Sequence, residues 1–143
     1  MILIDSSVLI DLLEESPEWH AWSSDQLFLA SCRDTLGINA LIFAEISRSF
    51  IDLRAVSAFL KATKIQYLDL PPEAAFLAQR AHQRYRALGG QRIATHPDFF
   101  IGAHASVNGY ALMTRDAKRI ETYFPEVEKI SPRGDRPDSR RSI

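Results

Sequence analysis

The chain opens with an apolar stretch that gives way directly to a polar one. Ile2–Ile4 are all large and apolar, and Asp5–Ser7 follow them. A run this short is typical of a central strand covered on both faces rather than of a buried helix. Apolar residues then recur at helical spacing over Val8–Leu13. The pattern predicts a strand that turns at once into a helix. Asp5 then stands at the carboxyl end of the strand, where open α/β sheets place their ligands.

The rest of the chain repeats this alternation of short apolar runs and longer amphipathic segments. Further strands are predicted at Thr35–Ile38, Ile65–Leu70, Tyr110–Thr114 and Val127–Ile130. Helices are predicted over Ser6–Glu15, Glu18–Ser31, Ala40–Phe50, Leu53–Thr63, Pro97–Asn108 and Ala117–Tyr123, with a longer one between Pro71 and Gly90. Because strands that alternate with helices are typical of parallel sheets, we expect an α/β fold with a mostly parallel central sheet of four to five strands.

The last segment of the chain has a different composition. Residues 131–143 are rich in Pro, Gly, Ser, Arg and Asp and lack apolar periodicity, which predicts a flexible, solvated tail. Their four arginines and two aspartates give a local charge of +2, so a weak contact with a phosphate backbone is the alternative. Residues 1–130 are expected to form one domain, since a chain of 143 residues is long enough for one sizeable core.

Composition and charge exclude several classes of protein. Hydrophobic residues make up 46% of the chain and charged residues 24%, which is ordinary for a globular domain. The net charge of −1 gives no overall basic field, so any contact with nucleic acid must be local. The opening strand is unlike a signal peptide, and no apolar run approaches the roughly 18 residues of a membrane span. Cys32 is the only cysteine, which excludes an internal disulfide. Because this fits a reducing compartment, we expect a cytoplasmic protein.

Acidic residues stand at four unusual places in this pattern. Asp5 and Asp116 each follow a predicted strand. Asp98 stands in the first turn of a predicted helix, and Glu45 interrupts an otherwise apolar helix. In a parallel sheet the helices begin at the edge where the strands end, so the three aspartates are expected at one edge. Helical side chains lean toward the N-terminus of their helix, which brings Glu45 within reach of the same edge.

Each of these carboxylates also has a simpler interpretation. Aspartates favour helix starts, so all three are candidates for capping, and Asp98 with Thr95 resembles a capping box. A carboxylate on an apolar helix face is costly unless it is paired or metal-bound. Arg48, three residues after Glu45, is the candidate partner. For each residue taken alone, these alternatives stay open.

The four carboxylates taken together favour a metal site. At one edge they would repel one another unless a cation lies between them. Ligands that are all oxygens, with no cluster of Cys or His, favour Mg²⁺ or Mn²⁺ over zinc. Such an ion would activate water and stabilise charge on a phosphodiester. Ser7 and Thr114 are placed to hold a water or to orient a carboxylate. The pattern indicates a metal-dependent nuclease.

The same residues resemble the PIN-domain ribonucleases, and within them the VapC-type toxins of bacterial toxin–antitoxin pairs. The matching pieces are Ile4–Ser7, Ala44–Ile46, Pro97–Ala105 and Thr114–Asp116. They occur in the family's order, and the resemblance covers about residues 1 to 130. It implies a three-layer α/β/α fold and a Mg²⁺- or Mn²⁺-dependent endoribonuclease. It also implies inhibition by a small antitoxin protein, together with homodimerisation.

Carried over residue by residue, the resemblance assigns specific positions. The family's acidic catalytic and metal-binding positions fall on Asp5, Glu45, Asp98 and Asp116, and its hydroxyl positions fall on Ser7 and Thr114. We expect the antitoxin to lay an apolar helix across a groove between aromatic-rich helices. The aromatic residues concerned are Trp19, Trp22, Phe28, Phe50 and Phe59.

Other polar residues near the predicted edge carry weaker expectations. Arg92, His96 and Arg115 are candidates for contacts with RNA phosphates, and the alternative is that they are solvated loop charges. His104 lies on an apolar helix and is expected to be a packed structural residue rather than a ligand.

Two other functions compete with the nuclease. Aspartyl phosphoryl transfer would need an acidic residue two positions after Asp5, or an adjacent acidic pair, together with a lysine at a later strand end. Position 7 is Ser7, and no lysine stands at the end of the Tyr110–Thr114 strand. A catalytically inactive PIN-fold module that binds RNA or protein is the main alternative. The complete set of carboxylates argues against it.

Overall fold

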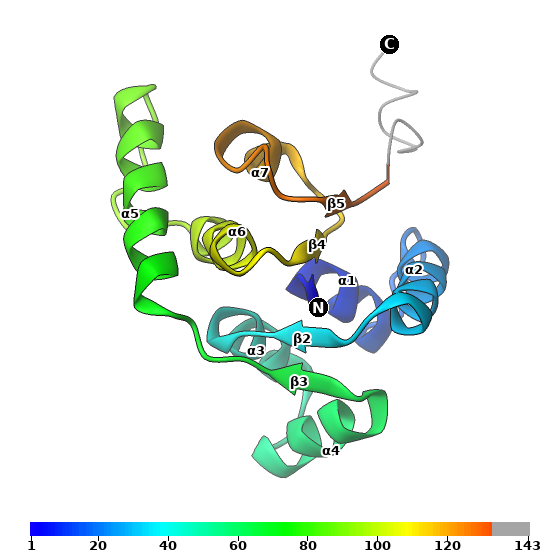
Figure 1. Cartoon of the computed structure of the whole chain (residues 1–143). Coiled ribbons are helices and arrows are strands. Elements are labelled where there is room, and N and C mark those ends of the chain that lie inside the picture. The colour runs from blue at the N-terminus through cyan, green and yellow to red at the C-terminus, as the bar shows by residue number, and fades with distance from the viewer. Residues whose placement is uncertain (133–143) are drawn as a thin grey trace.

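The computed structural model describes residues 1–132, which form a five-stranded sheet with helices packed around it (Figure 1). In chain order the strands are β1 (Ile2–Ile4), β2 (Leu36–Ile38), β3 (Ile65–Tyr67), β4 (Ala111–Met113) and β5 (Lys129–Ile130). All neighbouring strands pair in parallel, in the order β3-β2-β1-β4-β5. The predicted α/β fold with a mostly parallel sheet is therefore confirmed. Of the expected tail, residues 133–143 lie outside the described residues.

Seven α-helices connect the strands within residues 1–132. They are α1 (Ser6–Leu13), α2 (His20–Arg33), α3 (Ala40–Ile46), α4 (Leu53–Thr63), α5 (Pro72–Ala87), α6 (Pro97–Asn108) and α7 (Lys118–Tyr123). The helix expected over Ala40–Phe50 is shorter, because it tightens into a 3₁₀ turn at Ser47–Ser49. There the Ser47 hydroxyl donates to the Phe43 carbonyl at 2.6 Å, a bond that bends helices. No helix of the described part combines the length and apolar character that a membrane span requires.

The order of the strands reverses at β1, and this reversal positions the candidate site. The chain steps from β1 to β2 and β3 in one direction, and then crosses to β4 and β5 on the other side of β1. Because parallel crossovers are right-handed, the two directions place their helices on opposite faces of the sheet, which gives three layers. In such sheets, ligands bind outside the carboxyl ends of the strands at the point of reversal.

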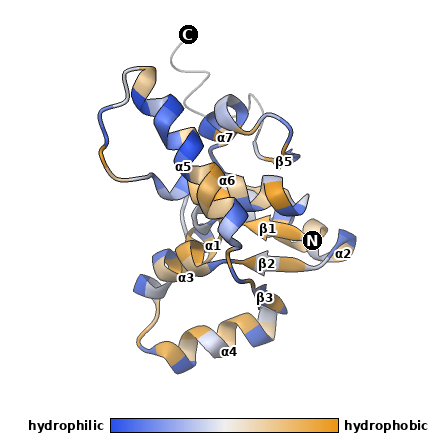
Figure 2. Cartoon of the chain, turned by 60° about the vertical axis from the view of Figure 1, so that its left-hand side comes forward, coloured by the Kyte–Doolittle hydropathy of each residue, from blue (hydrophilic) through white to orange (hydrophobic). Residues whose placement is uncertain are grey.

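The middle of the sheet forms the core. The β1 residues Ile2–Ile4 are fully buried, and Ile2 pairs with Leu36 on one side and Ala111 on the other. Figure 2 shows β1, β2 and α6 in hydrophobic colours, whereas the end of α5 is hydrophilic. A Cβ atom at Gly102 of α6 would overlap the ring of Phe124, which follows α7. Glycine at this position therefore lets the α7 segment pack tightly against the helix that carries Asp98.

Candidate active site

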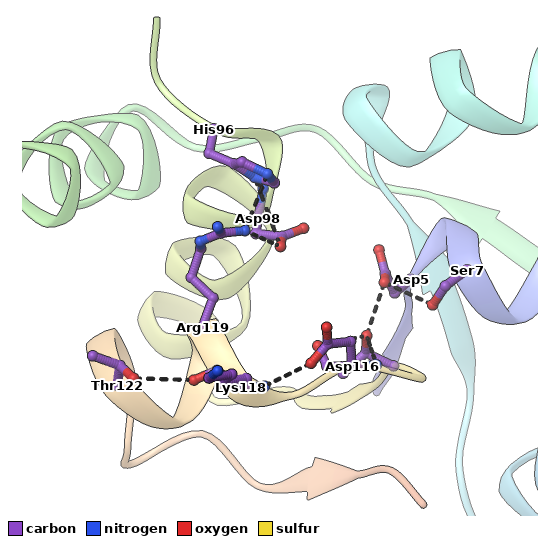
Figure 3. A network of polar contacts seen from close by, with 9 residues as sticks. Asp5, Ser7, His96, Asp98, Asp116, Lys118, Arg119 and Thr122 are labelled. Atoms are coloured by element: carbon purple, nitrogen blue, oxygen red, sulfur yellow. Dashed lines mark hydrogen bonds and ion pairs between the residues drawn. The ribbon is translucent and has the colours of Figure 1, made fainter. Parts of the chain in front are cut away.

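Asp5 lies at the junction of β1 and α1 and is held there by its backbone and its side chain. Its backbone N–H donates to the Met113 carbonyl of β4 at 2.9 Å. It occupies the N-cap position of α1, but its side chain makes no capping hydrogen bond. Instead, Asp5 Oδ2 accepts hydrogen bonds from Ser7 Oγ at 2.9 Å and Thr114 Oγ1 at 2.8 Å (Figure 3). The side chain of Asp5 is thus oriented by the two hydroxyls singled out in the sequence, and it does not cap the helix.

The surroundings of Asp5 disfavour a lone negative charge. Burial raises the pKa of the Asp5 carboxyl, and the negative charge of Asp98 raises it further. The hydrogen bonds from Thr114 and Ser7 lower this pKa but have smaller effects. A desolvated carboxylate beside a second carboxylate favours binding of a proton or of another cation.

Asp98 stands in the first turn of α6 and faces a cation from α7. Its backbone N–H donates to His96 Nδ1 at 3.0 Å, so His96 caps the helix. The capping box expected with Thr95 does not form, because Thr95 Oγ1 donates to Gln79 Oε1 instead. The side chain of Asp98 pairs with Arg119, whose Nη1 lies 3.0 Å from Asp98 Oδ2. Sequence reasoning missed Arg119, because nothing in its spacing pairs it with Asp98.

Glu45 lies inside α3, the helix capped by the side chain of Asn39. Partial burial raises the pKa of the Glu45 carboxyl, and the charge of Asp5 is the next largest cause. Arg48, the expected partner, forms an ion pair with Glu14 at 3.3 Å and has the smallest effect on the pKa of Glu45. Glu45 is therefore not explained by an ion pair with Arg48. Its carboxylate lies close enough to Asp5 for the two charges to interact.

Asp116 follows β4 and is exposed. Its Oδ1 accepts a hydrogen bond from the backbone N–H of Lys118, the first residue of α7, at 3.2 Å. Figure 3 shows Asp5, Asp98 and Asp116 directed toward one region from three different segments. Asp98 and Asp116 line a shallow pocket of about 310 Å³, to which Asp5 does not contribute. Its other residues are Tyr85, Lys118, Arg119, Thr122 and Tyr123.

The sequence matches the model of the PIN domain family over residues 2–125. The chain belongs to the PIN domain family. The resemblance inferred from the acidic motifs is therefore confirmed at the level of the family. No curated protein sequence matches the chain.

Solved structures share the fold of this PIN domain at low sequence identity. One of them is VapBC2 from Rickettsia felis, bound to a DNA fragment from its promoter. Its TM-score is 0.69 at 16% sequence identity, and the match covers 92% of this chain and 99% of that chain. DNA-bound VapBC from Salmonella typhimurium has a TM-score of 0.65 at 16% sequence identity, and the match covers 91% of this chain and 96% of that chain. A toxin–antitoxin complex from Klebsiella pneumoniae has a TM-score of 0.63 at 20% sequence identity, and the match covers 89% of this chain and 95% of that chain. At these identities the likeness shows the fold.

The PIN fold implies a divalent metal ion, and the donor atoms present fit one. Among residues 1–132, no three His, Cys, Asp or Glu side chains form a group that could hold a metal ion as they stand. The donors are nevertheless all oxygens, and the charge of Asp98 raises the pKa of both Asp5 and Glu45. A cation between these carboxylates would relieve their repulsion. Asp98 would then exchange its contact with Arg119 for one with the ion.

The residues expected to contact RNA differ in how accessible they are. Arg92 is exposed in the loop before α6, where its backbone N–H donates to the Tyr85 hydroxyl. Burial lowers the pKa of His96, with the charge of Asp98 acting in the opposite direction. Arg115 points its Nε toward Asp11 Oδ2 at 3.1 Å, on the side of α1 and α2.

His104 is packed in the interior of the PIN domain. It is fully buried, and its Nδ1 lies 3.2 Å from the side-chain nitrogen of Asn39. It contacts the residue that caps α3 and lies apart from the carboxylates. The expectation that His104 is packed is confirmed, and its purely structural role stays a prediction.

Proposed function

We propose that this PIN domain is a Mg²⁺- or Mn²⁺-dependent endoribonuclease that acts as the toxin of a toxin–antitoxin pair. The arrangement around Asp5 carries the proposal. Two hydroxyls hold its Oδ2, and a second carboxylate, Asp98, raises its pKa from the facing helix. Two carboxylates arranged in this way favour the binding of a hard cation between them. Membership of the PIN domain family supports phosphodiester cleavage as the chemistry.

Asp5, Glu45 and Asp98 would hold the ion, with Asp116 on the pocket side of the site. When bound, a divalent ion lowers the pKa of water and stabilises negative charge on a phosphodiester. Ser7 and Thr114 keep Asp5 in one orientation, so little reorganisation accompanies binding.

The substrate proposal rests on local charge. Lys118 and Arg119 line the pocket beside Asp98 and Asp116, and Arg92 is exposed in the loop before α6. These cations would contact phosphates and position an RNA strand across the carboxylates. Unpaired loops and single strands expose their bases and backbone, so they are the proposed form of the substrate.

The antitoxin is proposed to cover apolar surface on α2 and around α4. Phe28 on α2 is 68% exposed, and Leu53 at the start of α4 is equally exposed. An open pocket of about 510 Å³ lies beside α4 and β3, lined by Phe43, Ser57, Leu60, Ile65 and Tyr67. Large apolar side chains exposed in this way fit an apolar helix of a partner. The proposal includes a homodimer, as the family resemblance implies, and a cytoplasmic location, which the single cysteine favours.

The nuclease proposal is tested by cleavage of single-stranded RNA by the purified chain. We expect products with Mg²⁺ or Mn²⁺ and none with EDTA. Asp98→Asn should lose roughly two orders of magnitude or more in rate, because it removes metal-dependent stabilisation of several kcal/mol. Glu128→Gln is the matched control. It also neutralises a carboxylate that is paired with an arginine, but Glu128 precedes β5 and its ion pair with Arg33 is exposed. RNA binding without metal-dependent cleavage would contradict the proposal and favour the inactive binding module.

The antitoxin proposal is tested separately by co-expression with the small protein encoded by the neighbouring reading frame. We expect the two chains to co-purify and the complex to be inactive against RNA. The absence of a co-purifying small protein would contradict the toxin assignment and leave the nuclease proposal intact.

A further inference from the structure

Asp11 is a buried carboxylate outside the proposed metal site. It lies on α1, is 2% exposed, and accepts a hydrogen bond from Ser23 Oγ of α2 at 2.8 Å. The same oxygen, Oδ2, lies 3.1 Å from Arg115 Nε. An ionised carboxylate this deeply buried is costly unless it is paired and hydrogen-bonded. The position of Arg115 is therefore strongly coupled to that of Asp11.

Arg115 connects this buried pair to the loop after β4. Its guanidinium carbon lies 5.6 Å from the centre of the Trp19 ring, so Asp11 and Trp19 both contact the side chain. A guanidinium held by a carboxylate and an aromatic ring loses most of its freedom. Restricting this side chain limits how far the backbone of Arg115 can move. This backbone lies between Thr114 and Asp116.

The backbone of this loop orients both hydroxyls that hold Asp5. The Arg115 N–H donates to Ser7 Oγ at 3.2 Å, and the Ser7 hydroxyl donates to Asp5 Oδ2 at 2.9 Å. On the other side, the Asp116 N–H donates to Thr114 Oγ1 at 3.3 Å, and the Thr114 hydroxyl donates to Asp5 Oδ2 at 2.8 Å. Each hydroxyl accepts a backbone N–H, which favours directing its own proton toward Asp5. A displacement of the loop would weaken both bonds together.

We propose that Asp11 is a positioning residue of the active site, which acts through Arg115 to fix the loop Thr114–Asp116 and thereby the orientation of the Asp5 carboxylate. The consequence for catalysis rests on the proposed function, whereas the relay of contacts is a property of the fold. Removing a group that orients a metal ligand typically costs about 10–100-fold in metal affinity or activity. Asp11 has no contact with the proposed substrate, so the loss falls on kcat and leaves KM for RNA unchanged.

The test uses Asp11→Asn, which keeps the size of the side chain and removes its charge. We expect about 10-fold or more loss in kcat and a similarly weaker Kd for Mn²⁺. Arg115→Gln should behave in the same way, and the double variant should lose little more than either single one, because the two residues act in one chain of contacts. Val56→Ala is the control for stability alone, since Val56 is a buried residue of α4, which packs against β3 at the edge of the sheet.

A second readout does not depend on activity. Amide hydrogen exchange of the Arg115 N–H, followed by NMR in the metal-free protein, reports its bond to Ser7 directly. We expect at least about 10-fold faster exchange in Asp11→Asn than in Val56→Ala, whose destabilisation does not involve the loop. If Asp11→Asn does not fold, Trp19→Leu removes the contact of the guanidinium with the indole ring and carries the same expectation.

The outcomes separate the inference from the proposed function. Faster Arg115 exchange together with lower kcat and weaker Mn²⁺ binding supports the positioning role. Arg115 exchange, Mn²⁺ binding and kcat that match the Val56→Ala control would overturn it, even if the protein cleaves RNA. Faster exchange in a protein whose wild type cleaves no RNA would overturn the proposed function and leave the relay from Asp11 standing.

Discussion

The Nη1 atom of Arg119 lies 3.0 Å from Asp98 Oδ2, so a carboxylate of the candidate metal site is paired with a cation of the same chain. The same nitrogen lies 3.0 Å from His96 Nε2, and the guanidinium carbon lies 5.9 Å from the centre of the Phe99 ring. Arg119 is thus held beside the first turn of α6. On the proposed function, a divalent ion at Asp98 would compete with this guanidinium and leave it available to a phosphate of the substrate.

This competition predicts that Arg119→Gln binds Mn²⁺ more tightly and RNA more weakly. Both partners of the pair are 34% exposed, and a pair this exposed contributes about 0.2–1 kcal/mol, or up to about five-fold in Mn²⁺ affinity. Loss of one phosphate contact should reduce the salt dependence of RNA binding by about one unit of log–log slope. Calorimetric titration with Mn²⁺ and RNA binding over a salt series measure the two effects. Arg33→Gln is the control. If Arg119→Gln has the same Mn²⁺ affinity and the same salt dependence of RNA binding as Arg33→Gln, the competition is refuted.

The close packing of α6 against the α7 segment predicts a cost for a single methyl group. A Cβ atom at Gly102 would overlap the Phe124 ring and lie 3.0 Å from Ile120 Cδ1. Gly102→Ala should therefore destabilise the fold by about 1–3 kcal/mol, less the roughly 1 kcal/mol that alanine gains in helix propensity. Urea unfolding measures the change, with Val107→Ala on the exposed side of α6 as the control. A Gly102→Ala protein as stable as wild type would show that the two segments separate easily.

His104 predicts how stability depends on pH. Burial lowers the pKa of His104, whereas in the unfolded chain the imidazole takes up a proton near its ordinary pKa of about 6.5. Below that pH the unfolded state binds more protons than the folded state, so stability falls as the pH falls. The slope is at most about 1.4 kcal/mol per pH unit for this one site. Between about pH 7 and about pH 5.5, His104→Gln should lose less stability than wild type in urea unfolding.

The comparison of variant and wild type isolates His104 from other groups. Burial also lowers the pKa of His96, which contributes in the same direction in both proteins. Equal losses for the wild type and His104→Gln would mean that His104 is not the group that titrates.

The pattern of apolar residues predicted the elements well, because burial imposes the helical period and the length of a covered strand. Leu53–Thr63 and Pro97–Asn108 are helices over the predicted residues. Strand ends were overestimated. The run Ile65–Leu70 is a strand only to Tyr67, since pairing with the three residues of β2 sets its length. Pairing across strands is a tertiary property that local sequence does not contain.

The candidate site could be predicted as far as the sheet edge, because the ends of parallel strands meet there. The sequence could not show that Arg119 pairs with Asp98, since the two lie on different helices. Asp11 did carry a signal. It stands on the apolar face of α1, three residues after the buried Val8, where a carboxylate requires a partner. Only the fold shows that this partner is Arg115, which comes from the other end of the chain.

The exposed apolar surface predicts a partner contact at the start of α4. Leu53 is 68% exposed, so Leu53→Glu removes apolar surface without opening a cavity. We expect no change in Tm and a loss of antitoxin affinity of at least about 10-fold, because a charge must be buried at the contact. Co-purification and surface-binding measurements with the antitoxin test this. Leu88→Glu, equally exposed at the end of α5, is the control, and equal binding by both variants would place the antitoxin elsewhere.

Paired thermal melts decide whether the carboxylate of Asp5 belongs to a divalent metal site. Asp5 suits the test better than Asp98, whose charge is already paired with Arg119. In EDTA, Asp5→Asn should melt at or above wild type, because asparagine keeps the shape of the side chain and removes a partly buried charge whose pKa is raised. Millimolar Mg²⁺ should raise the Tm of wild type by several degrees through binding linkage and leave Asp5→Asn unchanged. A wild type that does not respond to Mg²⁺, beside an Asp5→Asn protein that melts lower in EDTA, would contradict the account.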